Sequence, residues 1–181
     1  MKMSEEKNHE YILKLVLLGD PAVGKTSLIN QYVDHIFETD YLPTLGANII
    51  VKEIEMDKIN GIAKLIIWDI AGQEIYDLSR RMFFQGCSGA LFMYDITRES
   101  TFDNIKNKWL HDFQKFEKNE VAFILIGNKT DLTDLRSVEK EKGEMLADNM
   151  NATNFIETSA KYGENVELAF QKLINHVILD E

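Results

Sequence analysis

A glycine-containing loop between an apolar strand and a helix is the feature that most constrains this chain. The loop reads Gly19-Asp20-Pro21-Ala22-Val23-Gly24-Lys25-Thr26 and fits the pattern G-x-x-x-x-G-K-[ST]. An apolar run over 12–18 precedes the loop, and residues 25–33 are predicted to form a helix. Glycines allow a backbone to curl closely around phosphate oxygens. The order of strand, loop and helix therefore predicts a phosphate-binding loop that follows a buried strand.

The residue types in this loop fit the binding of a nucleoside triphosphate. Lys25 can reach the outer phosphates and stabilise their charge during transfer, and the Thr26 hydroxyl can ligate Mg²⁺. The candidate nucleotide-binding residues here are Asp20, Pro21, Ala22, Val23, Gly24, Lys25, Thr26 and Ser27.

Strand-like and helix-like segments alternate along the rest of the chain. Strands are predicted over 11–18, 47–56, 62–70, 90–94, 121–127 and 154–157, and helices over 25–33, 101–116, 138–149 and 165–178. Residues 37–45 are predicted to be irregular, and Asn60-Gly61 indicates a hairpin turn. These segments predict a three-layer α/β fold of the P-loop NTPase type. Its six-stranded, mostly parallel sheet has one antiparallel edge strand and helices on both faces.

Composition indicates one ordered domain and excludes several function classes. We expect a polar extension over 1–10 and a single domain over 11–181. The single cysteine, Cys87, fits a reducing compartment, so we expect a cytoplasmic protein. A monomer is the default expectation for its oligomeric state. The net charge of −10 argues against general binding of nucleic acid or anionic lipid. Residues 164–181 contain no cysteine, so we expect membrane association only through a lipidated tail absent from this sequence or through partners.

Two further segments carry nucleotide chemistry after predicted strands. Asp69 closes a buried strand, where a Mg²⁺ ion would compensate its charge. Gly72 follows and can offer its backbone N–H to a terminal phosphate. The amide of Gln73 could orient an attacking water. In the second segment, Asp131 can accept hydrogen bonds from N1–H and the 2-amine of guanine, which adenine cannot supply. Asn128 would tie neighbouring loops together, and the Lys129 stem would lie over the base.

Ordinary structural interpretations of these residues remain open. The alternatives are a helix or turn cap for Asp69, an exposed amide without a role for Gln73, and a polar turn for residues 128–131. Three functions are considered: a GTP-hydrolysing switch, a GTP-bound scaffold with negligible hydrolysis, and a P-loop enzyme that uses ATP. The carboxylate of Asp131 speaks against the ATP-using enzyme.

Taken together, these segments resemble the Ras superfamily of small GTPases, and most closely its Rab branch. The matching segments are 17–20, 25–28, 41–46, 64–74, 94–97, 100–102, 127–131 and 157–161. Residues 64–69 and 92–97 carry the similarity to Rab proteins. Pro21, Ile70 and Ile75 depart from the commonest pattern, and Pro21 removes one N–H donor from the phosphate loop.

The resemblance implies a small G domain that binds GTP, GDP and Mg²⁺ and hydrolyses GTP slowly. It implies that Thr44 ligates Mg²⁺ with Thr26 and Asp69, and that Gln73, Lys25, Gly72 and Thr44 form the catalytic set. Around the nucleotide, it assigns Phe37 to the guanine, Tyr41 to the phosphates, the N–H of Ala160 beside Ser159 to guanine O6, and Lys161 to the base. Effectors, activating proteins and exchange factors are implied to bind through 37–47 and 72–84.

Overall fold

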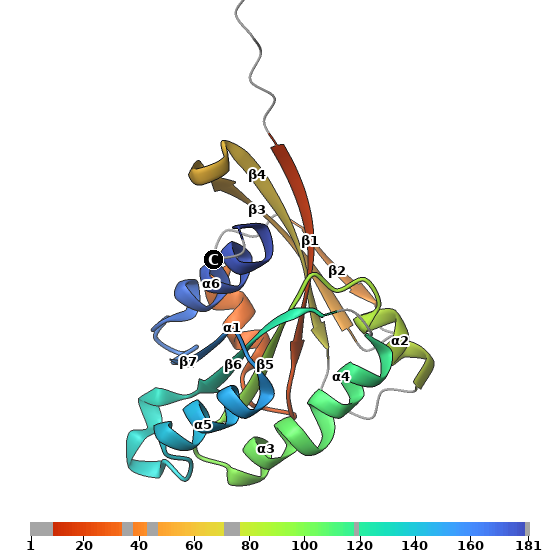
Figure 1. Cartoon of the computed structure of the whole chain (residues 1–181). Helices are drawn as coiled ribbons and strands as arrows, with labels where there is room; N and C mark the ends of the chain where they lie inside the picture. Colours follow the sequence, from red (N-terminus) through yellow and green to blue (C-terminus); the bar gives the residue numbers. More distant parts are fainter. Residues whose placement is uncertain (1–8, 34–37, 43–46, 71–76, 118–119, 180–181) are drawn as a thin grey trace, which may run out of the picture.

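A seven-stranded sheet with helices on both faces forms the centre of the protein (Figure 1). The computed structural model describes residues 9–33, 38–42, 47–70, 77–117 and 120–179. The strands are β1 (His9–Leu18), β2 (Glu38–Leu42), β3 (Ala47–Met56), β4 (Gly61–Ile70), β5 (Gly89–Asp95), β6 (Ala122–Asn128) and β7 (Asn154–Thr158). Their order across the sheet is β2-β3-β4-β1-β5-β6-β7. Neighbouring strands are parallel along the series β4, β1, β5, β6 and β7, while β3 is antiparallel to both of its neighbours, β2 and β4.

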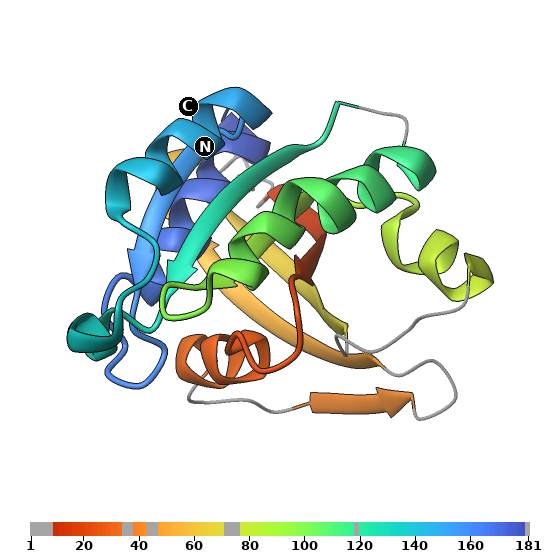
Figure 2. The same cartoon turned by 90° about the horizontal axis from the view of Figure 1, so that it is seen from below.

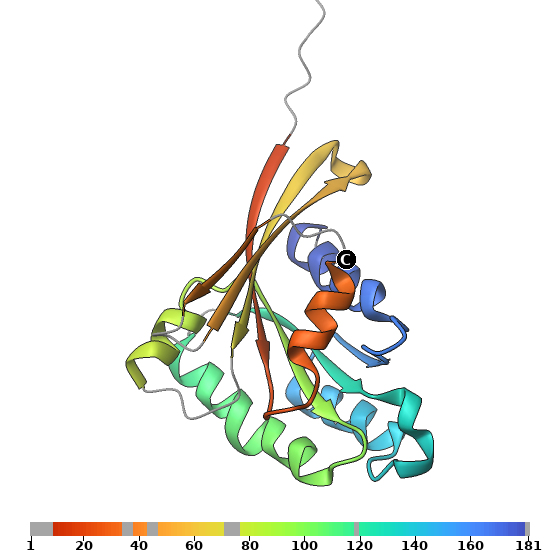
Figure 3. The same cartoon turned by 180° about the vertical axis from the view of Figure 1, so that it is seen from behind.

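The helices divide between the two faces of this sheet. Helices α1 (Lys25–Tyr32) and α6 (Val166–Leu179) pack beside each other on one face (Figure 3). The other face carries α2 (Asp77–Phe84), a long helix over 99–116, and α5 (Lys140–Met150). The long helix consists of α3 (Glu99–Asn104), the π-helical η2 (Ile105–Leu110) and α4 (His111–Phe116). Short 3₁₀ helices form η1 (Asp57–Ile59) and η3 (Thr130–Leu135).

The carboxyl halves of the central strands are apolar because both of their faces are covered. In β1, Leu15 and Leu17 belong to the core under α1 and α6, whereas Val16 and Leu18 belong to the core under α2 and the long helix. Side chains alternate between the faces of a strand, so the stretch of a strand that is covered on both faces needs apolar residues at successive positions. This explains why the sequence shows continuous apolar runs instead of alternation.

The structure confirms the predicted fold class, but the described sheet has seven strands where six were predicted, because one segment was predicted wrongly. Residues 38–42 were predicted to be irregular but form β2, which pairs with β3 from Glu38 opposite Val51 to Leu42 opposite Ala47. A strand this short gives little local signal, because its hydrogen bonds come from a neighbouring strand. With β2 outside it, β3 is no longer the edge strand. The first strand begins at His9, inside the expected polar extension, and the helix predicted over 101–116 contains an unexpected π-helical stretch.

Parallel strands bring their carboxyl ends to a common edge of the sheet. Figure 2 looks onto this edge, where the loop from β1 to α1, the start of α3 and η3 gather. Ligands of open α/β sheets bind at this edge. No helix among the described residues has the length and apolar character needed to cross a membrane.

Candidate functional site

The loop between β1 and α1 is shaped by two glycines that no other residue can replace without strain. Gly19 has φ of 150°, and a Cβ added to it would lie 2.2 Å from the backbone oxygen of Met93. Gly24 has φ of 104°, and its Cβ would lie 2.3 Å from Nδ2 of Asn128. Both positions combine a left-handed backbone with close approach of another element. The glycine spacing seen in the sequence therefore follows from contacts with β5 and β6.

Lys25 is held inside this loop by backbone oxygens. Its Nζ donates to the carbonyl oxygens of Gly19 at 2.8 Å and Asp20 at 3.0 Å, and the residue is 6% exposed. Burial lowers the pKa of Lys25 to about 8, while the carboxylates of Asp69 and Asp20 oppose the fall. A largely desolvated ammonium group fixed at this point is suited to binding an anion such as phosphate.

Thr26 and Asp69 meet beside the lysine. The Thr26 hydroxyl donates to Oδ2 of Asp69 at 2.5 Å, and Asp69 is 5% exposed near the end of β4. A hydroxyl and a buried carboxylate are the hard oxygen ligands that Mg²⁺ prefers, alongside waters and substrate phosphates. The chemistry of this pair therefore fits the predicted magnesium site.

Asn128, at the end of β6, links three segments around the site. Its Nδ2 donates to the carbonyl oxygen of Val23 at 2.8 Å in the phosphate loop. Its Oδ1 accepts hydrogen bonds from the Thr158 hydroxyl at 2.9 Å and from the Ala160 N–H at 3.0 Å. At 1% exposure, the amide is fully enclosed. The predicted role of tying neighbouring loops together agrees with these contacts.

Substituting Asn128→Ala should lower the free energy of unfolding by about 2 kcal/mol, because buried donors and acceptors lose their partners. Chemical denaturation of the nucleotide-free protein measures this change. Asn149→Ala is the matched control, since Asn149 is exposed on α5. A loss for Asn128→Ala no larger than that of the control would contradict the linking role.

The residues predicted to read the base lie together beyond Asn128. The Ser159 hydroxyl donates to Oδ1 of Asp131 at 2.7 Å and accepts the Tyr162 N–H at 3.3 Å. Ser159 is buried and Asp131 is half-buried, which leaves the carboxylate fixed but reachable. Lys161 is exposed, and its Nζ lies 4.8 Å from the centre of the Tyr162 ring. The N–H of Ala160, assigned by resemblance to guanine O6, donates to Asn128 in this structure.

Sequence reasoning missed the buried carboxylate that orients Lys129. Asp95 is 1% exposed at the end of β5, and its Oδ2 lies 2.7 Å from Nζ of Lys129 and 3.0 Å from Nε of Arg98. Burial disfavours the charged carboxylate, but hydrogen bonds from Lys129, Thr97 and Arg98 hold the pKa of Asp95 below its usual range. Arg98 also donates to the carbonyl oxygen of Pro21 at 3.0 Å. The position of Asp95 at a strand end was the signal that could have found it.

Several predicted site residues lie outside the described part of the chain. These are Phe37, Thr44, Gly72 and Gln73. The structure describes the backbone of Tyr41 opposite Asn48 in β2, and not its side chain. Ser27 is exposed on the first turn of α1. Among the described residues, the phosphate loop, Asp69 and the segments at 128–131 and 158–161 therefore form the candidate site.

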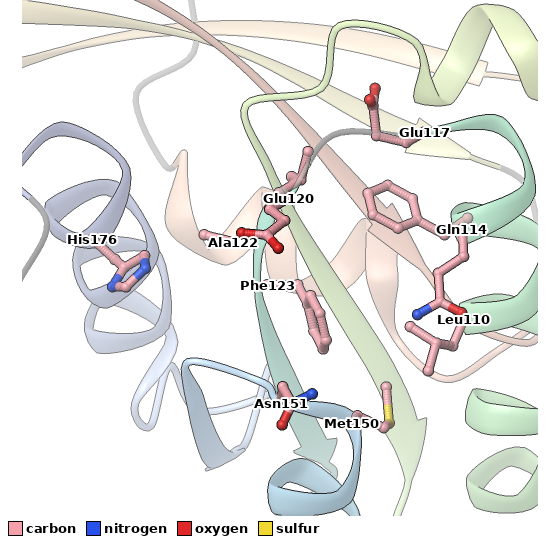
Figure 4. A pocket seen from close by; sticks show the side chains of 11 residues that line it. Leu110, Gln114, Glu117, Glu120, Ala122, Phe123, Met150, Asn151 and His176 are labelled. Atoms are coloured by element: carbon pink, nitrogen blue, oxygen red, sulfur yellow. The ribbon is translucent and has the colours of Figure 1, made fainter.

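A separate cavity of about 590 Å³ lies at the other end of the sheet. Its lining comes from η2 and α4, the start of β6, the end of α5 and α6, as Figure 4 shows. Leu110, Phe123 and Met150 contribute apolar surface, and Glu117 and Glu120 contribute carboxylates. None of the predicted nucleotide-binding residues lines this cavity. It is thus distinct from the candidate site at the carboxyl ends of the strands.

The sheet topology and the loop around Lys25 define the class of this protein as a P-loop nucleotide-binding α/β protein. Comparison with known proteins identifies the family, since the model of the Ras family matches residues 14–179. The chain belongs to the Ras family of small GTPases, in its Rab branch. These proteins bind GTP, GDP and Mg²⁺ and hydrolyse GTP, and regulators and effectors bind them.

Relatives from distant organisms are similar over nearly the whole chain. Ras-related protein Rab-8B of Homo sapiens is 40% identical over 174 residues, which cover 95% of this chain and 81% of that protein. Ras-related protein RABA6a of Arabidopsis thaliana is 41% identical over 95% of this chain and 72% of that protein. GTP-binding protein ypt3 of Schizosaccharomyces pombe is 38% identical over 97% of this chain and 80% of that protein. The residues that the family model matches, 14–179, include every loop of the candidate site.

Proposed function

We propose that the carboxyl edge of the sheet binds guanine nucleotides and that this chain acts as a GTP-hydrolysing switch in vesicle traffic. The observation that carries the proposal is the bond between Asn128 Nδ2 and the Val23 carbonyl oxygen, at 2.8 Å. This bond joins the phosphate loop to the segment that contains Asp131. One ligand with phosphates at one end and a purine at the other would span these two segments.

At the phosphate end, the chain supplies a cradle of backbone N–H groups and one ammonium group. Lys25, already oriented by the oxygens of Gly19 and Asp20, pairs with the outer phosphate oxygens. Thr26, Asp69 and Thr44 would hold Mg²⁺, Asp69 through a water, and the bound ion supplies positive charge against the phosphates. Lys25 then stabilises charge that develops on the leaving phosphate.

At the base end, Asp131 accepts hydrogen bonds from the N1–H and 2-amine of guanine. Ser159 holds Oδ1 of Asp131 at 2.7 Å, which fixes the direction of the carboxylate. The stem of Lys129, anchored by Asp95, covers one face of the base, with Phe37 and Lys161 completing the pocket. Adenine would place its N1 acceptor opposite the Asp131 carboxylate and has no 2-amine, so the ATP-using alternative is disfavoured.

Hydrolysis and switching depend on residues in the two segments 37–47 and 72–84. Gln73 orients the attacking water, while Thr44 and Gly72 contact the γ-phosphate through their backbone N–H groups. Loss of the γ-phosphate removes these contacts and changes the surface that both segments present. Effectors, activating proteins and exchange factors bind there, and such partners bring this cytoplasmic protein to membranes. No observation favours the scaffold without hydrolysis.

The nucleotide that accompanies the purified protein tests the binding proposal. We expect GDP or GTP to co-purify and to leave when EDTA removes Mg²⁺. Titration of the emptied protein should give GDP and GTP affinities that are micromolar or tighter, with ATP bound about 10³-fold more weakly. Equal affinity for ATP and GDP would contradict the guanine pocket.

Gln73→Leu should slow single-turnover release of phosphate from bound GTP by about 10- to 100-fold, because the attacking water loses its orientation. GTP affinity should stay unchanged, since the side chain acts on water. Gln171→Leu, on the exposed face of α6, is the matched control. An unchanged rate in the Gln73 variant would remove Gln73 from the catalytic set.

A further inference from the structure

The carboxylate of Asp20 is buried in the phosphate loop and held by the long helix over 99–116. Its Oδ2 accepts a hydrogen bond from Nδ2 of Asn104 at 2.7 Å, and its Oδ1 accepts one from Nε1 of Trp109 at 2.8 Å. Asp20 is 9% exposed and Trp109 is 4% exposed. Figure 2 shows the loop after β1 passing beside this helix. A buried carboxylate is thus satisfied by two uncharged donors from one element.

The π-helical stretch explains how one helix presents both donors. Asn104 and Trp109 are five positions apart, and η2 occupies Ile105–Leu110 between and around them. In a regular α-helix, residues five apart point roughly 140° away from each other around the axis. In a π-turn, the backbone hydrogen bond joins residues i and i+5, so residues five apart lie much closer to the same face. The wider turn therefore lets both side chains reach the same carboxylate.

Asp20 connects these donors to the functional lysine. The side chain of Asp20 is held by Asn104 and Trp109, while its own carbonyl oxygen accepts the Lys25 ammonium group at 3.0 Å. The neighbouring Pro21 carbonyl oxygen is bound by Arg98, just before α3. The backbone that orients Lys25 is therefore anchored through Asp20 to the long helix and through Pro21 to the residue just before that helix.

The helix itself is a firm support for this contact. The core between this helix and the sheet buries Ile105, Trp109 and Phe113. The ring of Phe113 contacts that of Phe92 in β5 edge to face, with 5.6 Å between the ring centres. A donor on such an element loses little conformational entropy when it binds. Through this helix, the side chain of Asp20 is held in a fixed position relative to the sheet.

We propose that Asn104 and Trp109 are positioning residues that hold the phosphate loop, through Asp20, in the shape that retains guanine nucleotide. The proposal rests on the proposed function, because it concerns how tightly the phosphate loop holds its ligand. Asn104 and Trp109 act on the nucleotide only through the loop backbone and Lys25. Loosening the contact speeds release of GDP without altering which base is bound.

The test measures release of a fluorescent GDP analogue from the Mg²⁺-loaded full chain. Trp109→Phe keeps the ring in the core and removes the N–H; it should speed release by about 10-fold, as expected for a buried hydrogen bond to a charged acceptor. Asn104→Ala should speed release similarly. The matched controls are Trp68→Phe, whose indole N–H lacks a partner among the described residues, and Asn107→Ala, exposed on the same helix.

Two further measurements separate positioning from general stability. The ³¹P resonance of the β-phosphate of bound GDP should move in Trp109→Phe and Asn104→Ala and stay in place in both controls. With Asp20 replaced by Ala, adding Trp109→Phe should change the release rate by less than about 2-fold, because the two changes remove one interaction. A purely structural role would lower thermal stability while leaving the resonance unmoved.

The outcomes distinguish the two proposals. If the wild-type chain fails to bind GDP, the proposed function is overturned. If the wild type binds GDP but release from Trp109→Phe and Asn104→Ala matches the controls, the positioning role is overturned and the proposed function stands. Additive effects of Asp20→Ala and Trp109→Phe would likewise overturn the positioning role.

Discussion

Replacing Lys25 with Ala should weaken GDP and GTP binding by about 10³-fold, since loss of one member of a buried charge pair costs several kcal/mol. The structure gives the reason for so large an effect. Lys25 is 6% exposed, and both of its protein partners are backbone oxygens that hold the amine in one place. No other described lysine lies in the phosphate loop, so its charge has no substitute among those residues.

Calorimetric titration with GDP measures the affinity, and thermal unfolding with and without GDP gives an independent reading. Ligand bound to the native state raises the unfolding temperature, so the wild type should be stabilised by GDP and the variant should not. Lys64→Ala is the control, because Lys64 forms a surface pair with Glu53 at 3.7 Å. GDP affinity within about 10-fold of wild type in Lys25→Ala would contradict the role of the lysine.

Replacing Asp131 with Asn should exchange guanine for xanthine as the preferred base. The amide presents an N–H to the 2-oxygen of xanthine and loses the acceptor that guanine requires, so guanine selectivity should fall by about 10⁴-fold. The fold should tolerate the change, since Asn keeps an oxygen that can accept the Ser159 hydroxyl, now 2.7 Å from Oδ1. The specificity should therefore change while the protein remains folded.

Competition between GDP and xanthosine diphosphate for the emptied protein measures this exchange directly. Asp134→Asn serves as the control, because Asp134 is exposed in the same 3₁₀ helix, η3. Full preference for GDP in the Asp131 variant would show that another group reads the base.

Much of the candidate site could be predicted because its chemistry is local in the sequence. The glycines, Lys25 and Thr26 lie within one continuous loop, and Asn128, Lys129 and Asp131 lie within another. Continuous apolar runs before these loops predict parallel strands, and parallel strands bring their following loops to one edge. The fold class and this part of the site thus follow from patterns within short windows.

Contacts between distant segments had no such signal. The strand β2 depends on its pairing with β3, and the irregular path predicted for this segment was wrong over 38–42. Asp95 was overlooked because its cations, Arg98 and Lys129, come together only in the folded chain. A π-turn is equally hidden, since the sequence 105–110 reads as an ordinary amphipathic helix.

The sequence by itself determined the family, the sheet with its covering helices, and the loops that carry phosphate and base chemistry. Each of these depends on neighbouring residues, on continuous apolar runs or on a helical period of 3.6. Tertiary structure alone decided what holds those loops in place. Asp20 meets Asn104 and Trp109 across 84 and 89 positions of sequence. Hydrogen bonds between such distant groups form only once the core has packed the helix against the sheet, and no local pattern encodes that geometry.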